Sequence, residues 1–181
     1  MSGSIYKLEI KQAEVSTRPD GRFDLTVGYE GYNGPHSQTE VFDKTDVDGI
    51  LKACESVAQK IFHAEFRLND AVTLHFELKE DAGLKLWHTQ PNLYVKCQLT
   101  MKMDWTCNYL SQSYNTMMTL GLVELPSELS LHGNGLGDNE TALVIMNSMA
   151  SGIEFMGNIM MMRDSIDHDA EMRSQARLRQ I

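Results

Sequence analysis

The chain has 181 residues, of which 42% are hydrophobic and 23% charged, and 16 basic against 25 acidic residues give a net charge of −9. This globular mixture argues against disorder, and a chain of this length can bury a real core without a metal or disulfide. An acidic chain lacks the positive electrostatic field that a general binder of nucleic acids or anionic membranes needs. We therefore expect neither nucleic acid nor membrane among its partners.

Three cysteines, Cys54, Cys97 and Cys107, form an odd set without Cys-x-x-Cys spacing. This argues against a disulfide framework and a structural zinc site. The first residues show neither a basic segment nor an apolar run, so no secretory signal is expected. Together these features predict a cytoplasmic protein.

The first forty residues alternate between apolar and polar positions, which predicts strands with one buried side. Strands are expected over 6–10, 23–29 and about 38–42, separated by turns at Pro19-Asp20-Gly21 and Asn33-Gly34-Pro35. This pattern predicts an antiparallel meander.

The period then becomes helical, and residues 47–62 place their apolar side chains on one face. Thr45 and Asp48 have capping-box spacing, which predicts a helix start near Asp46. Alternation over 72–78 predicts the next strand.

A long alternation over 93–105 predicts a strand that is bent, bulged or projecting, because it would span roughly 40 Å. Residues 108–120 are expected to be helical, followed by a brief extended piece at 129–131. A glycine-rich loop, 133–137, precedes a long helix from Asp138.

The long helix is unusually apolar, since Glu154 is the only charged residue between Glu140 and Arg163. Glu154 and nearby polar residues argue against a membrane span. Polar residues at positions 147, 151, 154 and 158 form one narrow line along the helix. That line is expected to face water if this is a core helix within one chain.

The sequence thus predicts an α+β fold: a mainly antiparallel sheet, one amphipathic helix and a long methionine-rich C-terminal helix. It reads as one globular unit with two parts, a sheet and helix domain over 1–131 and a helical segment over 132–181, and no internal repeat is evident. Because the first helix already covers the sheet, the second is expected to need partners from other chains. We therefore predict a homo-oligomer formed through apolar and small residues of this helix: Met146, Met149, Gly152, Met156, Ile159 and Met160.

Several motifs resemble metal-binding or catalytic sites, but each lacks a residue or spacing that such a site requires. Residues 44–55 resemble a calcium loop, but Lys44 stands where an acidic ligand is needed. The glycine loop has no accompanying Gly-x-Ser-x-Gly nucleophile elbow, and Cys54 and Cys97 are expected on buried faces, where thiols are inert. The histidines lack metal-ligand spacing, which leaves a site only if His75 and His88 converge in the fold. We therefore expect no catalytic residue, metal or cofactor.

The glycine loop and the helix start after it form the best candidate binding site. A helix N-terminus offers free N–H groups to a phosphate or carboxylate, although an ordinary hinge would have the same sequence. The candidate ligand residues are glycines and polar residues of this segment: Gly133, Asn134, Gly135, Gly137, Asn139 and Thr141.

These observations predict a non-enzymatic, homo-oligomeric binding protein. It would sequester a small anionic, nucleotide-like ligand or inhibit a partner protein, as the inhibitors and sponges that viruses encode do. Two alternatives stay open: a structural subunit of a particle or filament, and an enzyme with a site between subunits.

Overall fold

The computed structural model describes residues 5–32, 34–66, 73–80, 94–107, 112–126 and 136–179. In chain order its elements are β1 (Glu9–Thr17), β2 (Phe23–Gly31), β3 (Gly34–Phe42), α1 (Val47–Phe66), β4 (Thr73–Glu80), β5 (Tyr94–Cys107), β6 (Gln112–Pro126) and α4 (Leu136–Arg179). The predicted α+β class, the N-terminal meander and the long C-terminal helix are confirmed.

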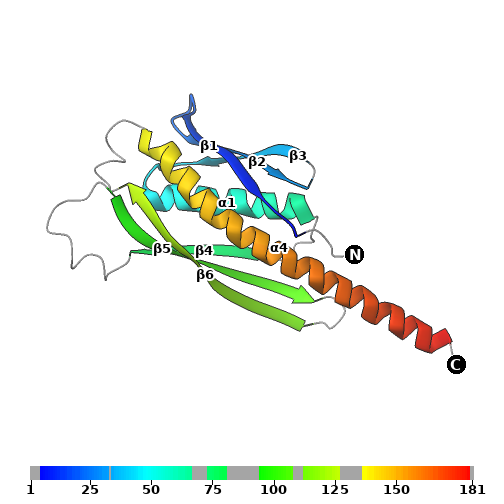
Figure 1. Ribbon diagram of the computed structural model, residues 1–181. Helices are drawn as coiled ribbons and strands as arrows, with labels where there is room; N and C mark the ends of the chain where they lie inside the picture. Colours follow the sequence, from blue (N-terminus) through cyan, green and yellow to red (C-terminus); the bar gives the residue numbers. More distant parts are fainter. Residues whose placement is uncertain are drawn as a thin grey trace.

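The strands form two antiparallel three-stranded sheets, β1-β2-β3 and β4-β5-β6, where the sequence predicted one. Each sheet is followed by a helix, so the chain contains two successive βββα units. Figure 1 shows α1 and α4 lying between the two sheets. The repeat is structural and is not evident in the sequence. The division of the chain at residue 131 stays a prediction.

Strand β6 corrects the prediction of a helix over 108–120, of which residues 112–120 lie in the described part of the chain. Residues 112–119 pair with β5 in one register, from Cys107 opposite Gln112 to Thr100 opposite Thr119. Exposed Met117 alternates with half-buried Met118, which is the period of a strand. The register shift at Leu99 and Thr100 leaves Leu120 of β6 as the extra residue, so this bulge lies in β6, whereas β5 pairs with β4 in unbroken register. That β5 itself is bent, bulged or projecting stays a prediction.

Three polar side chains of α4 accept hydrogen bonds from the backbone along the free edge of β1 and the residues before it. Glu154 Oε1 accepts the Leu8 N–H at 2.7 Å, and Asn158 Oδ1 accepts the Tyr6 N–H at 2.9 Å. Asn139 Oδ1 accepts the Val15 N–H at 2.6 Å. Half of the predicted polar line therefore faces a sheet edge, while Asn147 and Ser151 are exposed.

Helix α1 likewise accepts hydrogen bonds from the backbone of β4, the first strand of the other unit. Glu55 Oε2 accepts the Phe76 N–H and Gln59 Oε1 accepts the Leu74 N–H, both at 2.8 Å. In both helices the acceptors are four residues apart and the donors two residues apart. Each unit's helix thus satisfies backbone donors of the other unit, which would otherwise be an unpaired sheet edge.

The methionine-rich part of α4 is buried by the chain's own sheets and α1. The fully or nearly fully buried side chains of this part include Met146, Met149, Ile153, Met156 and Met160. The expectation that this helix is too large to be covered by its own chain is therefore wrong up to residue 160. Of the six residues predicted to join subunits, only Ile159 is partly exposed.

Two glycines allow α4 to approach its neighbours closely. A Cβ on Gly152 would lie 2.8 Å from Met101 Sδ, and one on Gly157 would overlap the Phe66 ring. Gly152 therefore faces a sheet of its own chain, where the sequence had suggested a notch for a second helix. Among the described helices, none has a stretch long and apolar enough to span a membrane.

Candidate binding groove

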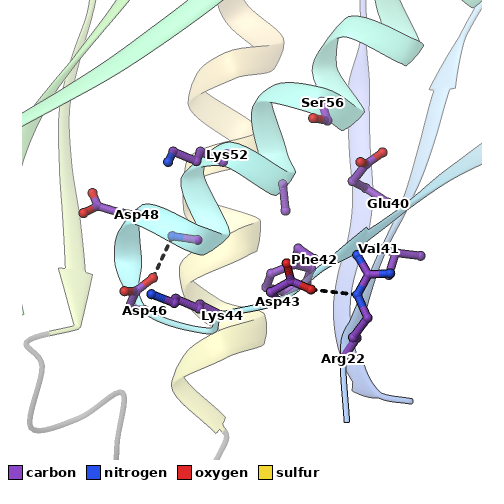
Figure 2. A pocket seen from close by; sticks show the side chains of 12 residues that line it. Arg22, Glu40, Val41, Phe42, Asp43, Lys44, Asp46, Asp48, Lys52 and Ser56 are labelled. Carbon is purple, nitrogen blue, oxygen red and sulfur yellow. Dashed lines mark hydrogen bonds and ion pairs between the residues drawn. The ribbon is translucent and has the colours of Figure 1, made fainter. Parts of the chain in front are cut away.

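A hollow surface lies along α1, where the helix runs beside β3 and β4. It consists of two adjoining cavities of about 520 Å³ each, which share Glu40 and Ser56. The first lies at the amino end of α1, against the end of β3, and Figure 2 shows it from close by. The second continues along α1 to β4. We call these two cavities together the α1 groove.

The first cavity forms where the chain leaves β3 and enters α1. Asp46 Oδ1 accepts the Gly49 N–H at 2.8 Å, so Asp46 is the N-cap of the helix. The predicted helix start is confirmed, but the cap is Asp46 in place of Thr45. A Cβ on Gly49 would overlap the Lys44 carbonyl oxygen, so glycine is needed for this tight entry.

Charged side chains of both signs line the first cavity. Arg22 Nε lies 2.7 Å from Asp43 Oδ1, and Lys60 from the adjoining cavity lies 2.6 Å from Glu40. In contrast, Lys44 and Lys52 line the cavity with no carboxylate of the described residues within 4 Å. Two ammonium groups at a helix N-terminus are therefore available to an anion.

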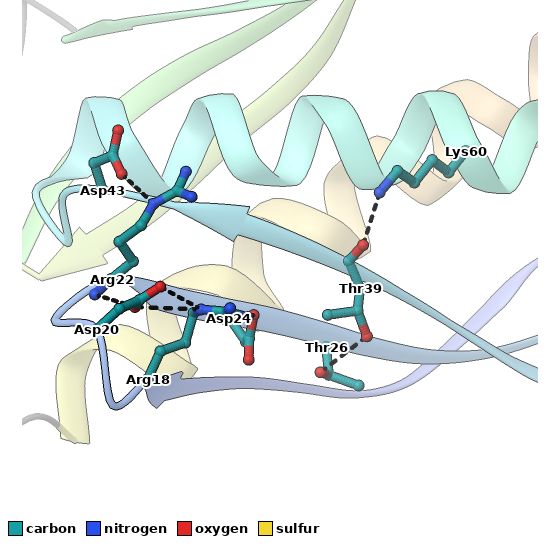
Figure 3. A network of polar contacts seen from close by, with 8 residues as sticks. All are labelled: Arg18, Asp20, Arg22, Asp24, Thr26, Thr39, Asp43 and Lys60. Carbon is teal, nitrogen blue, oxygen red and sulfur yellow. Dashed lines mark hydrogen bonds and ion pairs between the residues drawn. The ribbon is translucent and has the colours of Figure 1, made fainter.

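The turn between β1 and β2 fixes Arg22 at the cavity (Figure 3). Its Asp20 carboxylate accepts the Arg22 N–H at 3.0 Å, and Gly21 adopts a φ of 85°. That hydrogen bond, followed by the nearby Arg18, lowers the pKa of Asp20. The predicted turn at Pro19-Asp20-Gly21 thus holds a charged side chain at the rim.

The second cavity is built mostly from residues that already have partners. Glu55 and Gln59 accept the backbone N–H groups of β4 described above, and Gln59 also contacts His63 Nε2 at 2.6 Å. Lys60 donates to the Thr39 carbonyl at 2.7 Å. This part of the groove is therefore a polar, preformed wall.

The structure places only part of the predicted ligand site. Gly133, Asn134 and Gly135 lie outside the described residues, whereas Gly137, Asn139 and Thr141 lie in the first turns of α4. The Asn139 oxygen already accepts a β1 N–H, and Thr141 is fully buried. A ligand at this loop stays a prediction, and it would have to bind without these two side chains.

Cysteine and metal chemistry were the catalytic possibilities considered from the sequence. Burial raises the pKa of the Cys54 thiol, which favours the unreactive protonated form. No group of three metal-ligating side chains occurs in the described ranges. His75 lines the second cavity, but His88 lies outside the described residues, so their convergence is not tested.

Sequence reasoning missed the α1 groove although it considered the same segment. Residues 44–55 suggested a calcium loop and were interpreted as a capped helix start. The interpretation is right for Asp46. The lysines at positions 44 and 52 line a cavity only because β3 and the β1–β2 turn lie beside them, which the local sequence does not indicate. No protein-family model, curated protein or solved structure matches the chain.

Proposed function

We propose that this is a non-enzymatic, cytoplasmic binding protein that holds a small anionic ligand in the α1 groove. The observation that carries the proposal is the first cavity, where Lys44 and Lys52 have no ion-pair partner among the described residues and lie near the amino end of a 20-residue helix. Its volume of about 520 Å³ is within the usual range for small-molecule sites, roughly 300–1,000 Å³.

The composition of the cavity also narrows the ligand. Asp46 and Asp48 lie beside the two lysines, so a ligand of anionic groups alone would meet repulsion at one side. A ligand with a phosphate or carboxylate at one end and amino or other N–H donors at the other fits both sets of charges. Nucleotides and phosphorylated amino compounds belong to this class.

A buried thiol supports the cytoplasmic part of the proposal. Cys54 is a free cysteine whose Sγ lies 3.9 Å from the Ala142 carbonyl oxygen in the core. A free thiol in the core is typical of a reducing compartment.

A thermal-shift panel of nucleotides, phosphorylated metabolites and amino acids tests the proposal. A ligand at a hundred times its dissociation constant should add about 2.7 kcal/mol of stability. The variant Lys44→Met/Lys52→Met should lose most of that gain, while Lys102→Met, which removes an exposed lysine of β5, should keep it. If no compound shifts the wild-type protein, the alternative of a purely structural assembly subunit is favoured.

A further inference from the structure

Three of the four outer strands of the two sheets receive hydrogen bonds from helix side chains. Helix α4 covers the edge of β1, and α1 covers the edge of β4, through the acceptors described above. Lys60 of α1 donates to the Thr39 carbonyl of β3 at 2.7 Å. The fourth outer strand, β6, has β5 as its only neighbour among the described strands. Over residues 117–123, no described helix side chain bonds to its backbone. We call this outer side of residues 112–126 the β6 edge.

The β6 edge also carries the exposed apolar side chains of its sheet. Met117 is 72% exposed and Leu122 58%. The β5 residues opposite them, Lys102 and Gln98, are exposed and polar, and β4 continues that polar face with exposed His75. The solvent face of this sheet is therefore polar on β4 and β5 and apolar beside the open edge. An open edge with apolar side chains is a template for another strand.

The charge of the β6 edge favours a second copy of the chain as that other strand. In a two-fold antiparallel pair a strand meets itself, so charges of one sign would lie close together and repel. Residues 117–123 include no charged residue, although the whole chain has a net charge of −9. Two acidic copies can therefore meet at β6 without placing like charges in the middle of the contact.

The length of β6 also suits pairing with itself. Thr119 is the midpoint of this 15-residue strand, so two copies centred on Thr119 overlap along nearly the whole strand. Because Leu120 is the extra residue of the bulge, Met117 then lies opposite the partner's Leu122, and by symmetry this contact occurs twice. Both exposed apolar side chains of each copy are covered in this register.

The area of such a pair is sufficient for a specific dimer. A strand of 15 residues is about 50 Å long, and a sheet with its side chains is about 10 Å thick. The contact would therefore bury about 500 Å² per copy and about 1,000 Å² in total, which is the size at which specific interfaces begin. A shorter peptide would leave part of the edge open.

We propose that two copies of this chain associate by antiparallel pairing of their β6 edges, which joins two three-stranded sheets into one continuous sheet. This surface differs from the buried methionine face of α4 that the sequence suggested for a homo-oligomer. No residue of β6 lines the α1 groove, so the association does not depend on ligand binding.

Light scattering and sedimentation of the 181-residue protein test this pairing. The wild type should approach twice its 20.5 kDa mass at micromolar concentration. Met117→Lys/Leu122→Lys sets lysine opposite lysine at both contacts and removes apolar contact, so it should raise the dissociation constant roughly 10-fold or more. Met117→Glu/Leu122→Glu should do the same. Mixing the lysine variant with the glutamate variant should restore a heterodimer.

Controls separate this effect from net charge and from misfolding. Ser16→Lys/Ser37→Lys makes the same change in net charge at exposed positions of β1 and β3 and should leave the mass unchanged. The β6 variants should keep the Tm of the wild-type monomer, because they alter exposed side chains. Hydrogen exchange gives a second readout: the outward-facing amides of β6 should be protected in the wild-type dimer and should lose protection on dilution.

Three results would overturn the proposal. The first is a wild type that stays monomeric at about 100 µM. The second is a dimer that the lysine variant leaves intact, and the third is a dimer whose β6 amides exchange at the same rate at every protein concentration.

Discussion

The bond from Leu8 to Glu154 is predicted to hold the two βββα units together. Glu154 Oε1 accepts the Leu8 N–H at 2.7 Å, and Leu8 itself is 5% exposed. Replacing Glu154 with leucine keeps an apolar stem in the helix but leaves a backbone donor with no acceptor. Loss of a hydrogen bond to a charged group costs about 1.5–3 kcal/mol.

Thermal unfolding should register that loss directly. For a chain of this size 1 kcal/mol corresponds to about 2–4 °C, so Glu154→Leu should lower Tm by roughly 3–12 °C. Glu154→Gln keeps a neutral acceptor and should cost about half as much. Hydrogen exchange should show the cause, because the Leu8 amide should lose protection in the leucine variant.

Matched variants test whether the lost hydrogen bond causes the change in Tm. Glu55→Leu should have a similar effect on the Phe76 amide, because it removes the corresponding acceptor of α1. Glu140→Leu, at an exposed position of α4, should change Tm by little more than about 2 °C. An unchanged Tm together with an unchanged Leu8 exchange rate in Glu154→Leu would refute the reasoning.

Three further predictions concern the core. Gly157→Ala should destabilise the protein by about 1–3 kcal/mol in urea unfolding, although alanine favours helix, because its Cβ overlaps the Phe66 ring; an unchanged midpoint would contradict this contact. Thr141→Val should raise stability by about 1 kcal/mol, since the fully buried hydroxyl has no hydrogen-bond partner in the described structure; a loss of stability would reveal a partner. Burial, and then the hydrogen bond to Glu65, raises the pKa of Tyr6 above the ordinary tyrosine value of 10.0. Folded Tyr6 therefore keeps its proton when unfolded tyrosine ionises, and stability should fall as pH rises above about 10. Tyr6→Phe should weaken that alkaline dependence, and an identical pH profile would count against it.

The sequence predicted the elements with a clear local period. Strand β2 and helix α1 follow the alternation and the helical stripe closely. Strand β6 was predicted as a helix, because its strand character depends on pairing with β5 along its whole length. Tertiary pairing decides such ambiguous segments, and no local propensity reports it.

The polar residues of α4 show a second limit of the sequence. Their spacing correctly marked one narrow line, but the line was expected to meet water. The backbone N–H groups of Tyr6 and Leu8 lie about 150 residues away in the chain, and only the fold brings them to Asn158 and Glu154. The same is true of the α1 groove, whose two lysines are joined by residues of β3 and of the β1–β2 turn.

The most direct test of the proposed function is an amide NMR titration of the protein with a phosphate-bearing ligand from the panel. The account predicts that the largest shifts occur at the first turn of α1, over Val47, Asp48 and Gly49, and near Lys52. The amides of Gly137 and Asn139 should stay in place. Shifts confined to the start of α4, or no saturable shift at all, would contradict a binding site in the α1 groove.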